Sequence, residues 1–81
     1  MSIVPEQSRA ARALLNWSQA RLAEAAKVAR ATLAEFEAGK RTPYERTLAD
    51  IQTTLESAGV EFIAENGGGP GVRLRKAAGP D

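Results

Sequence analysis

The sequence predicts a mainly α fold of four to five helices, followed by a C-terminal β-hairpin. Within residues 8–58 apolar side chains recur at helical spacing, as at Leu48, Ile51 and Leu55. Residues 60–75 change character, because two short segments there alternate apolar and polar side chains like strands. The chain has 81 residues, so we expect one domain at most, with a small core.

The composition excludes several classes of chemistry. The chain contains no Cys and no His, which removes disulfides, thiolate metal sites, Cys nucleophiles and His-based general bases. Its carboxylates are scattered on polar faces, and the glycine-rich residues 67–71 are not followed by the Gly-Lys-Ser/Thr of a phosphate-binding loop. We therefore predict that the protein is not an enzyme and uses no metal or cofactor.

Charge is unevenly distributed although the net charge is only +1. Residues 9–46 carry eight basic and four acidic side chains, whereas residues 47–65 carry four acidic side chains and no basic one. Such polarity can orient a domain on an anionic partner, and the alternative is ordinary solvated surface charge. No apolar run approaches the ~20 residues that span a bilayer, so we expect a cytoplasmic protein without membrane contact.

The first two expected elements are a lead-in and a helix. Residues 1–7 contain Pro5 and little apolar periodicity, and we expect them to be flexible. A helix over residues 8–15 follows, and it ends where Asn16-Trp17-Ser18 interrupts the pattern. Ser18 is a good N-cap for the next helix, with Trp17 and Leu22 placed to form a hydrophobic staple.

The alanine-rich stretch over residues 18–37 reads as two helices rather than one. On a continuous helical wheel, Val28 lies well away from Leu22 and Leu33, so a single helix would not place them on one face. Two segments separated by a turn at Lys27 fit the apolar pattern better. The third helix then ends at Gly39, which favours left-handed backbone geometry.

A fourth helix and the hairpin complete the chain. Residues 40–44 form a polar loop, and the helix runs roughly over residues 45–58 with Gly59 as its stop. We expect a hairpin over residues 59–76 and a flexible tail over residues 77–81, the alternative to the hairpin being a disordered glycine-rich tail. The register that gives one apolar face pairs Ala64 with Val72, Phe62 with Leu74, Glu65 with Gly71, Ile63 with Arg73 and Glu61 with Arg75.

The central part of the chain resembles a known DNA-binding family. Gln19, Ala23, Val28, Leu33, Phe36, Glu37 and Gly39 have the spacing of helix-turn-helix proteins of the phage repressor and Cro type, the XRE family. The resemblance runs from about residue 12 to residue 55. It implies a repressor-like helix-turn-helix DNA-binding domain over residues 8–58, whose third helix enters the major groove.

By this resemblance, the residues that contact DNA bases are Ala29, Arg30, Ala31, Thr32 and Glu35. Those that contact DNA phosphates are Ser18, Gln19, Lys40, Arg41 and Thr42. The family also implies a structural ion pair between Arg12 and Glu37. Two positions depart from the pattern. Lys27 stands where the family usually has Gly, and its Cβ in left-handed backbone geometry costs ~1 kcal/mol. Ala29 stands where the family commonly has Ser or Thr.

The leading functional hypothesis is a dimeric, sequence-specific transcriptional regulator, most simply a repressor that occupies a palindromic operator in double-stranded DNA. The alternative is an antitoxin or antiactivator that acts mainly by binding another protein, such as a toxin or an activator. A lone hairpin is marginally stable and leaves an open edge, so we expect it to form the homodimer. The expected interface residues are Val60, Phe62, Ile63, Val72 and Leu74.

Overall fold

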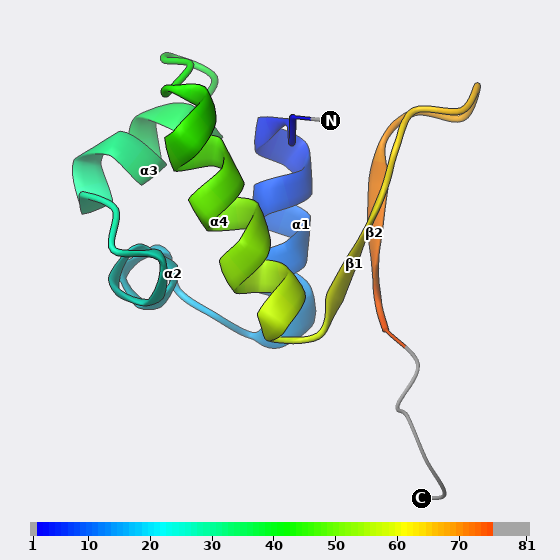
Figure 1. Cartoon of the computed structure of the whole chain (residues 1–81), viewed down its shortest axis with the longest axis horizontal. Coiled ribbons are helices and arrows are strands. Elements are labelled where there is room, and N and C mark those ends of the chain that lie inside the picture. The colour runs from blue at the N-terminus through cyan, green and yellow to red at the C-terminus, as the bar shows by residue number, and fades with distance from the viewer. Residues whose placement is uncertain (1, 76–81) are drawn as a thin grey trace, which may run out of the picture.

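Four helices and a two-stranded antiparallel sheet make up the computed structural model, which describes residues 2–75 (Figure 1). This architecture confirms the predicted fold class. The elements are α1 (Pro5–Leu15), α2 (Gln19–Ala26), α3 (Arg30–Glu37), α4 (Glu45–Ser57), β1 (Val60–Ile63) and β2 (Gly71–Leu74). The expected tail over residues 77–81 lies outside the described residues.

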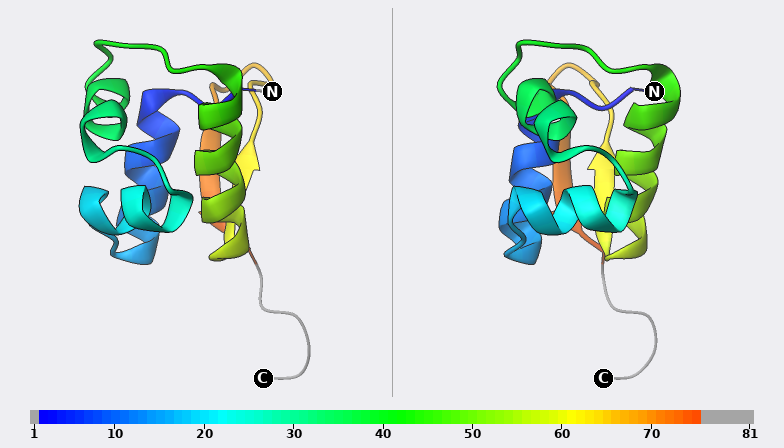
Figure 2. Two further views of the ribbon diagram at one scale, coloured as in Figure 1. Left: turned by 60° about the vertical axis from the view of Figure 1, so that its left-hand side comes forward. Right: turned by 90° about the vertical axis from the view of Figure 1, so that its left-hand side faces the viewer.

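The elements form three layers. α1 and α4 lie in the middle, with α2 and α3 on one side and the hairpin on the other (Figures 1 and 2). The core lies between these layers and is built from the apolar faces that the helical spacing indicated. Its fully buried large side chains include Leu22, Leu33, Ile51, Leu55 and Val60. Trp17 and Val28 pack against the core from its margin and are partly buried.

The first residues are ordered into the fold, so the expected flexible lead-in is wrong for residues 2–7. α1 begins at Pro5 instead of Ser8, and the side chain of Ile3 is only 3% exposed. Pro5 suits the first helical position, because its fixed φ is helical and the amide it lacks has no partner there. Gln7 stabilises the same turn, since its Oε1 accepts the Val4 N–H at 3.0 Å.

The turn between α2 and α3 confirms the two-helix interpretation. Lys27 ends α2 with φ 58° and ψ 44°, which is left-handed geometry. At the other end of α2, the Ser18 hydroxyl accepts the Arg21 N–H at 3.0 Å, as expected of an N-cap. The apolar pattern was therefore a better guide than helix propensity, which favours one continuous helix through this alanine-rich segment.

Replacing Lys27 by glycine is expected to raise the free energy of unfolding by up to about 1 kcal/mol, or about 4–8 °C in Tm. Glycine removes the Cβ that disfavours left-handed geometry, although it also adds entropy to the unfolded chain. Thermal unfolding followed by circular dichroism measures the effect. Asn16→Gly is the matched control, because Asn16 has nearly the same dihedral angles (φ 58°, ψ 41°) but tolerates them better. A fall in Tm for Lys27→Gly would contradict the inferred strain.

The hairpin forms, but its register differs by two residues from the predicted one. Glu61 pairs with Arg73, and Phe62 pairs with Val72. The connection is correspondingly longer, over residues 64–70, and the Glu65 carboxylate stabilises it by accepting the N–H groups of Gly67 and Gly69 at 3.1 Å each. A shift of two residues keeps every side chain on its predicted face. The opposite-charge pair is therefore Glu61–Arg73, at 2.8 Å.

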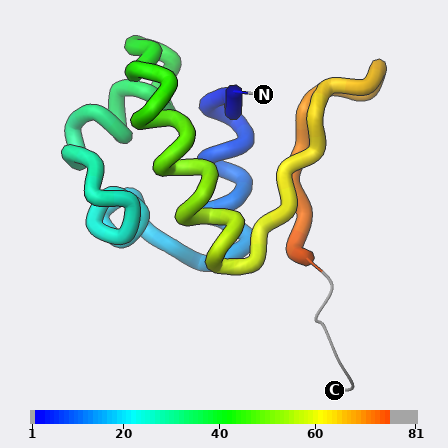
Figure 3. Tube along the Cα trace, in the orientation of Figure 1, coloured from blue at the N-terminus to red at the C-terminus, as the bar shows by residue number. Residues whose placement is uncertain are grey.

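The hairpin packs on the helices of its own chain. The trace runs from α4 through Gly59 into β1 and returns along β2 beside α1 (Figure 3). Val60 is fully buried, and Phe62 and Val72 pack against the core. These three residues were expected in a dimer interface, and the chain itself covers much of their surface. Of the expected set, only Leu74 has more than half of its surface exposed (52%), and Ile63 is half-buried.

One buried side chain fastens the hairpin to the helices. The Gln7 Nε2 group donates to the carbonyl oxygens of Ile63 at 3.3 Å and of Gly71 at 3.0 Å. Gln7 therefore bonds to both strands while its Oε1 caps α1. The sequence pattern did not indicate this role, because a glutamine near the start of a helix normally lies on the surface.

Candidate nucleic-acid interface

After the turn at Lys27, α3 lies beside α2 in the layer on the far side of α1 and α4 from the hairpin (Figure 1). Leu33 and Phe36 of α3 are buried in the core. Of the predicted base-contacting residues at the start and along the length of α3, Ala29, Arg30, Ala31 and Glu35 are exposed and Thr32 is half-buried. Ala29 is the N-cap and makes no side-chain capping bond, so the departure from Ser or Thr leaves this helix start uncapped. All five residues are therefore at least partly accessible to a partner.

The predicted phosphate-contacting residues lie in two separate segments. Ser18 and Gln19 begin α2, where backbone N–H groups without helical partners favour an anion. Lys40, Arg41 and Thr42 lie in the exposed connection between α3 and α4. Ser18 already accepts a bond from its own helix, so its hydroxyl hydrogen is left to donate to a phosphate.

Two of these candidates are already bonded within the chain. The Arg41 guanidinium contacts the Glu35 carboxylate at 3.4 Å, and both side chains are about half exposed. The Gln19 Nε2 group donates to Glu37 at 2.9 Å. An exposed pair such as Arg41–Glu35 contributes about 0–1 kcal/mol, so DNA can replace it at small cost. Gln19 is held more firmly, and its second amide hydrogen is the group left for a phosphate.

The Glu37 carboxylate is the centre of a buried network. Its Oε1 atom accepts from Arg12 Nη2 at 2.7 Å and from Gln19 Nε2 at 2.9 Å, and its Oε2 atom accepts from Ser8 Oγ at 2.5 Å. The Glu37 side chain is 1% exposed and that of Arg12 is 19% exposed. The structure thus brings Arg12 and Glu37 together as the resemblance implies. The hydrogen bonds to Glu37 join the end of α3 to α1 and α2.

Several residues of this network were not identified from the sequence. Ser8 lies one helical turn before Arg12, a spacing that signals a shared face of α1 once Arg12 is assigned. Arg9 donates to the backbone carbonyl of Glu37 and so bonds to the C-terminal end of α3. Arg12 also donates to the carbonyl of Trp17 at 3.1 Å, and Arg21 lies 4.8 Å from the centre of the Trp17 ring. Together these contacts fix the entry to α2.

The stability of the fold is expected to fall in acid because of Glu37. Burial raises the pKa of this carboxyl, but hydrogen bonds from Arg12, Ser8 and Gln19 outweigh burial and hold the pKa below its ordinary value of 4.5. The unfolded chain therefore takes up the proton first as the pH falls. The contribution of the ionised Glu37 carboxylate to folding stability is therefore complete above its ordinary pKa. It is lost as the pH falls through the lowered pKa of the folded state.

Urea unfolding between about pH 7 and about pH 3 measures this dependence, and Glu37→Gln provides the comparison. Below the ordinary pKa of the Glu37 carboxyl, the free energy of unfolding is expected to fall more steeply in the parent than in the variant. The variant has no carboxyl at this position to protonate. Parallel curves for the two proteins would show that Glu37 is not the group responsible.

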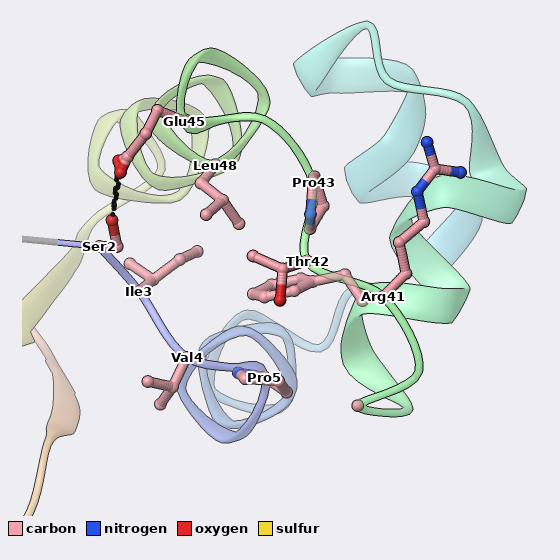
Figure 4. A pocket seen from close by; sticks show the side chains of 11 residues that line it. Ser2, Ile3, Val4, Pro5, Arg41, Thr42, Pro43, Glu45 and Leu48 are labelled. Carbon is pink, nitrogen blue, oxygen red and sulfur yellow. Dashed lines mark hydrogen bonds between the residues drawn. The ribbon is translucent and has the colours of Figure 1, made fainter.

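The connection between α3 and α4 covers a cavity of about 370 Å³ (Figure 4). Ile3 and Leu48 point into it, whereas Arg41 points away toward the outside. Ser2 Oγ donates to the Glu45 carboxylate at 2.7 and 3.0 Å and so ties the first residues to the start of α4. The lining is largely apolar, and we interpret the cavity as a gap left beneath the loop that carries Lys40 and Arg41.

Two negative findings apply to residues 2–75. No group of three or more His, Cys, Asp and Glu side chains in this part of the chain is placed to hold a metal ion. None of the helices described is long and apolar enough to cross a membrane.

Comparison with known proteins supports the assignment of the fold. A model of the helix-turn-helix family matches residues 9–59, which is more than half of the chain. A search among curated proteins found no match to the chain. The matched segment includes α2, the left-handed turn at Lys27 and α3, and also the Arg12–Glu37 pair. The chain belongs to the XRE-type helix-turn-helix family of DNA-binding transcription regulators.

Proposed function

We propose that the protein is a cytoplasmic, sequence-specific repressor that acts as a homodimer by occupying a palindromic operator. The observation that carries the proposal is the accessible surface of α3, which the buried Glu37 network holds rigidly against α1 and α2. A reading helix must keep its side chains in fixed register with the bases, and bonds at its C-terminal end provide that rigidity. A repressor that acts by occupying its operator requires no catalytic group.

Arg30 is the principal base-reading residue in this proposal. It is the first residue of α3 and is exposed, and helix-turn-helix proteins contact bases with the N-terminal part of this helix. Its guanidinium fits the O6 and N7 atoms of guanine. Ala29, Ala31 and the Thr32 methyl group suit thymine methyl groups, and Glu35 suits the cytosine N4 amine once Arg41 is released to a phosphate.

Phosphate contacts position the helix in the groove. The start of α2 and the loop over residues 40–42 supply backbone N–H groups, two cationic side chains and hydroxyls from two separate parts of the fold. Such contacts fix orientation without reading sequence and make affinity depend on salt. Lys40 suits this role best, because it is exposed and makes no ion pair within residues 2–75.

Selection of bound fragments from random double-stranded DNA, followed by footprinting, tests the proposal. We expect an enriched motif of two inverted half-sites centred about one DNA turn apart, ~34 Å. Affinity for this motif should exceed that for unrelated DNA by roughly 10³-fold or more at physiological salt. Recovery of no motif, with equal affinity for all sequences, would overturn sequence-specific regulation.

A second candidate function is the binding of another protein, as by an antitoxin or antiactivator. The observation in its favour is the exposure of three large side chains, Leu14 (40%), Leu74 (52%) and Tyr44 (83%). Scattered apolar groups of this kind are also common on monomeric proteins. Co-purification of a stoichiometric protein that displaces DNA from the repressor would support this second function in addition to the first.

A further inference from the structure

The loop of the hairpin contains an asparagine that is followed by a glycine. This loop, over residues 64–70, extends away from the helices (Figure 1), and Asn66 and Gly67 in it are both exposed. The chain has one other asparagine, Asn16, which is followed by the bulky Trp17. Asparagine is a chemically labile residue, and its lability depends on how easily the next backbone nitrogen reaches its side-chain amide. The two asparagines therefore differ in the feature that controls their chemical stability.

The geometry around Gly67 favours attack of its nitrogen on the Asn66 side chain. Gly67 has φ 101°, and a β-carbon placed on it would meet no described atom within 4 Å beyond its chain neighbours. The Asn66 side chain leans over the residues that follow it, since its Oδ1 atom lies 3.8 Å from where a β-carbon on Gly68 would be. Glycine also lets the backbone rotate into the conformation that ring closure needs. The nucleophile and the electrophile are thus neighbours in an open loop.

One carboxylate opposes this attack by holding the nucleophile. Glu65 Oε2 accepts the N–H groups of Gly67 and Gly69, at 3.1 Å each. Ring closure requires the Gly67 nitrogen to lose its proton and to turn toward Asn66. These changes break a charge-assisted hydrogen bond, and they build negative charge on a nitrogen that already lies beside a carboxylate. Glu65 therefore raises the barrier to a reaction that the Asn-Gly sequence favours.

We infer that Asn66 is a site at which the chain modifies itself by deamidation, and that Glu65 sets the rate. The Gly67 nitrogen loses its proton to solvent and bonds to Cγ of Asn66. The Cγ–Nδ2 bond then breaks, and Nδ2 takes up a proton from solvent and leaves as ammonia. Water opens the resulting succinimide ring at either carbonyl and leaves aspartate or isoaspartate at position 66. Water is the only co-reactant, and the reaction does not require DNA.

The product changes the hairpin loop in charge and in length. Either form adds a negative charge next to Glu65, whose carboxylate organises the loop. Isoaspartate also places an extra methylene group in the main chain. The loop is flanked by Ile63 and Gly71, whose carbonyl oxygens accept the two bonds from Gln7 Nε2. Modification should therefore loosen the attachment of the hairpin to α1, so that an aged sample melts at a lower temperature than a fresh one.

Peptide mapping by mass spectrometry of the full chain, incubated at neutral pH, tests the site. In the folded parent we expect Asn66 to convert to aspartate and isoaspartate faster than Asn16 in the same samples. Glu65→Ala should convert position 66 roughly 2- to 10-fold faster, because a hydrogen bond no longer has to be broken. Gly68→Ala is the matched control, since its β-carbon would meet only Asn66 Oδ1, at 3.8 Å, and both reacting groups stay in place. Equal acceleration in the two variants would overturn the role of Glu65.

Unfolding the parent in urea gives a second measurement, which does not depend on how the variants fold. Without the folded loop, Asn66 should convert faster than in the folded parent, and at nearly the same rate in the parent and in Glu65→Ala. A folded parent that converts as fast as the unfolded one would overturn the control by Glu65, as would a folded Glu65→Ala variant that is no faster than the parent. Conversion of Asn66 no faster than that of Asn16 in the folded parent would overturn the site itself.

Discussion

Replacing Glu37 by alanine is expected to lower the free energy of unfolding by about 3–5 kcal/mol, because it removes one partner of a buried ion pair. The substitution leaves the Arg12 guanidinium without its carboxylate and deprives Ser8 and Gln19 of their acceptor. A domain of this size has a total stability of roughly 4–12 kcal/mol. The variant should therefore be partly unfolded at room temperature or melt far below the parent, as circular dichroism with urea would measure.

Glu35→Ala is the matched control for this experiment. Glu35 lies on the same helix but is exposed, and within residues 2–75 its carboxylate makes only the 3.4 Å ion pair with Arg41. Its loss should change the free energy of unfolding by less than about 0.5 kcal/mol. Equal stabilities for the two variants would mean that the network does not hold α3 in place. Glu37→Gln should fall between them, since it keeps the shape and loses the charge.

Replacing Arg30 by alanine should weaken binding to the selected operator by about 1–3 kcal/mol, or roughly 5- to 150-fold. The loss arises because the bidentate contact to guanine is specific to one base pair. Preference at that position should relax while affinity for unrelated DNA changes little. Arg30→Lys should recover only part of the loss, because an ammonium group cannot reproduce the planar fork. Binding to a panel of single-base operator variants measures both effects.

Lys40→Ala is the comparison that separates reading from positioning. It should weaken binding to all sequences alike and reduce the salt slope of log affinity by about 1, since one phosphate contact is lost. Unchanged operator affinity in both the Arg30 and the Lys40 variants would show that α3 and its following loop do not face DNA. Both side chains are exposed, so neither substitution is expected to disturb the core.

The helical part of the fold was predictable because its signals are local. Ser18 and Lys27 set the limits of α2, and the inward positions of Leu22 and Leu33 follow from spacing alone. The hairpin register was not predictable from the strands alone. A shift of two residues leaves every side chain on the same face, and it still pairs Glu61 with an arginine, Arg73 instead of Arg75. That choice depends on the loop, where the Glu65 carboxylate accepts two backbone N–H groups.

The candidate site was predictable only as far as family resemblance reaches. The resemblance gave the Arg12–Glu37 pair, but not the Ser8 hydroxyl or the bond from Gln19, which depend on how three helices meet. Gln7 and Ile3 were missed for a similar reason, because their partners lie far away in the sequence. Long-range contacts of single polar side chains leave no periodic pattern for sequence reasoning to detect.

The bonds from Gln7 to Ile63 and Gly71 have a consequence for folding kinetics. They close loops of 56 and 64 residues, whereas the turns between the helices close within a few residues. Local contacts form early, and closure of a long loop carries a larger entropic cost. Docking of the hairpin should therefore be a late step, during synthesis as well as in refolding. Until residues 60–74 emerge from the ribosome, the first helix lacks part of its packing surface and the nascent chain is most open to proteases and chaperones.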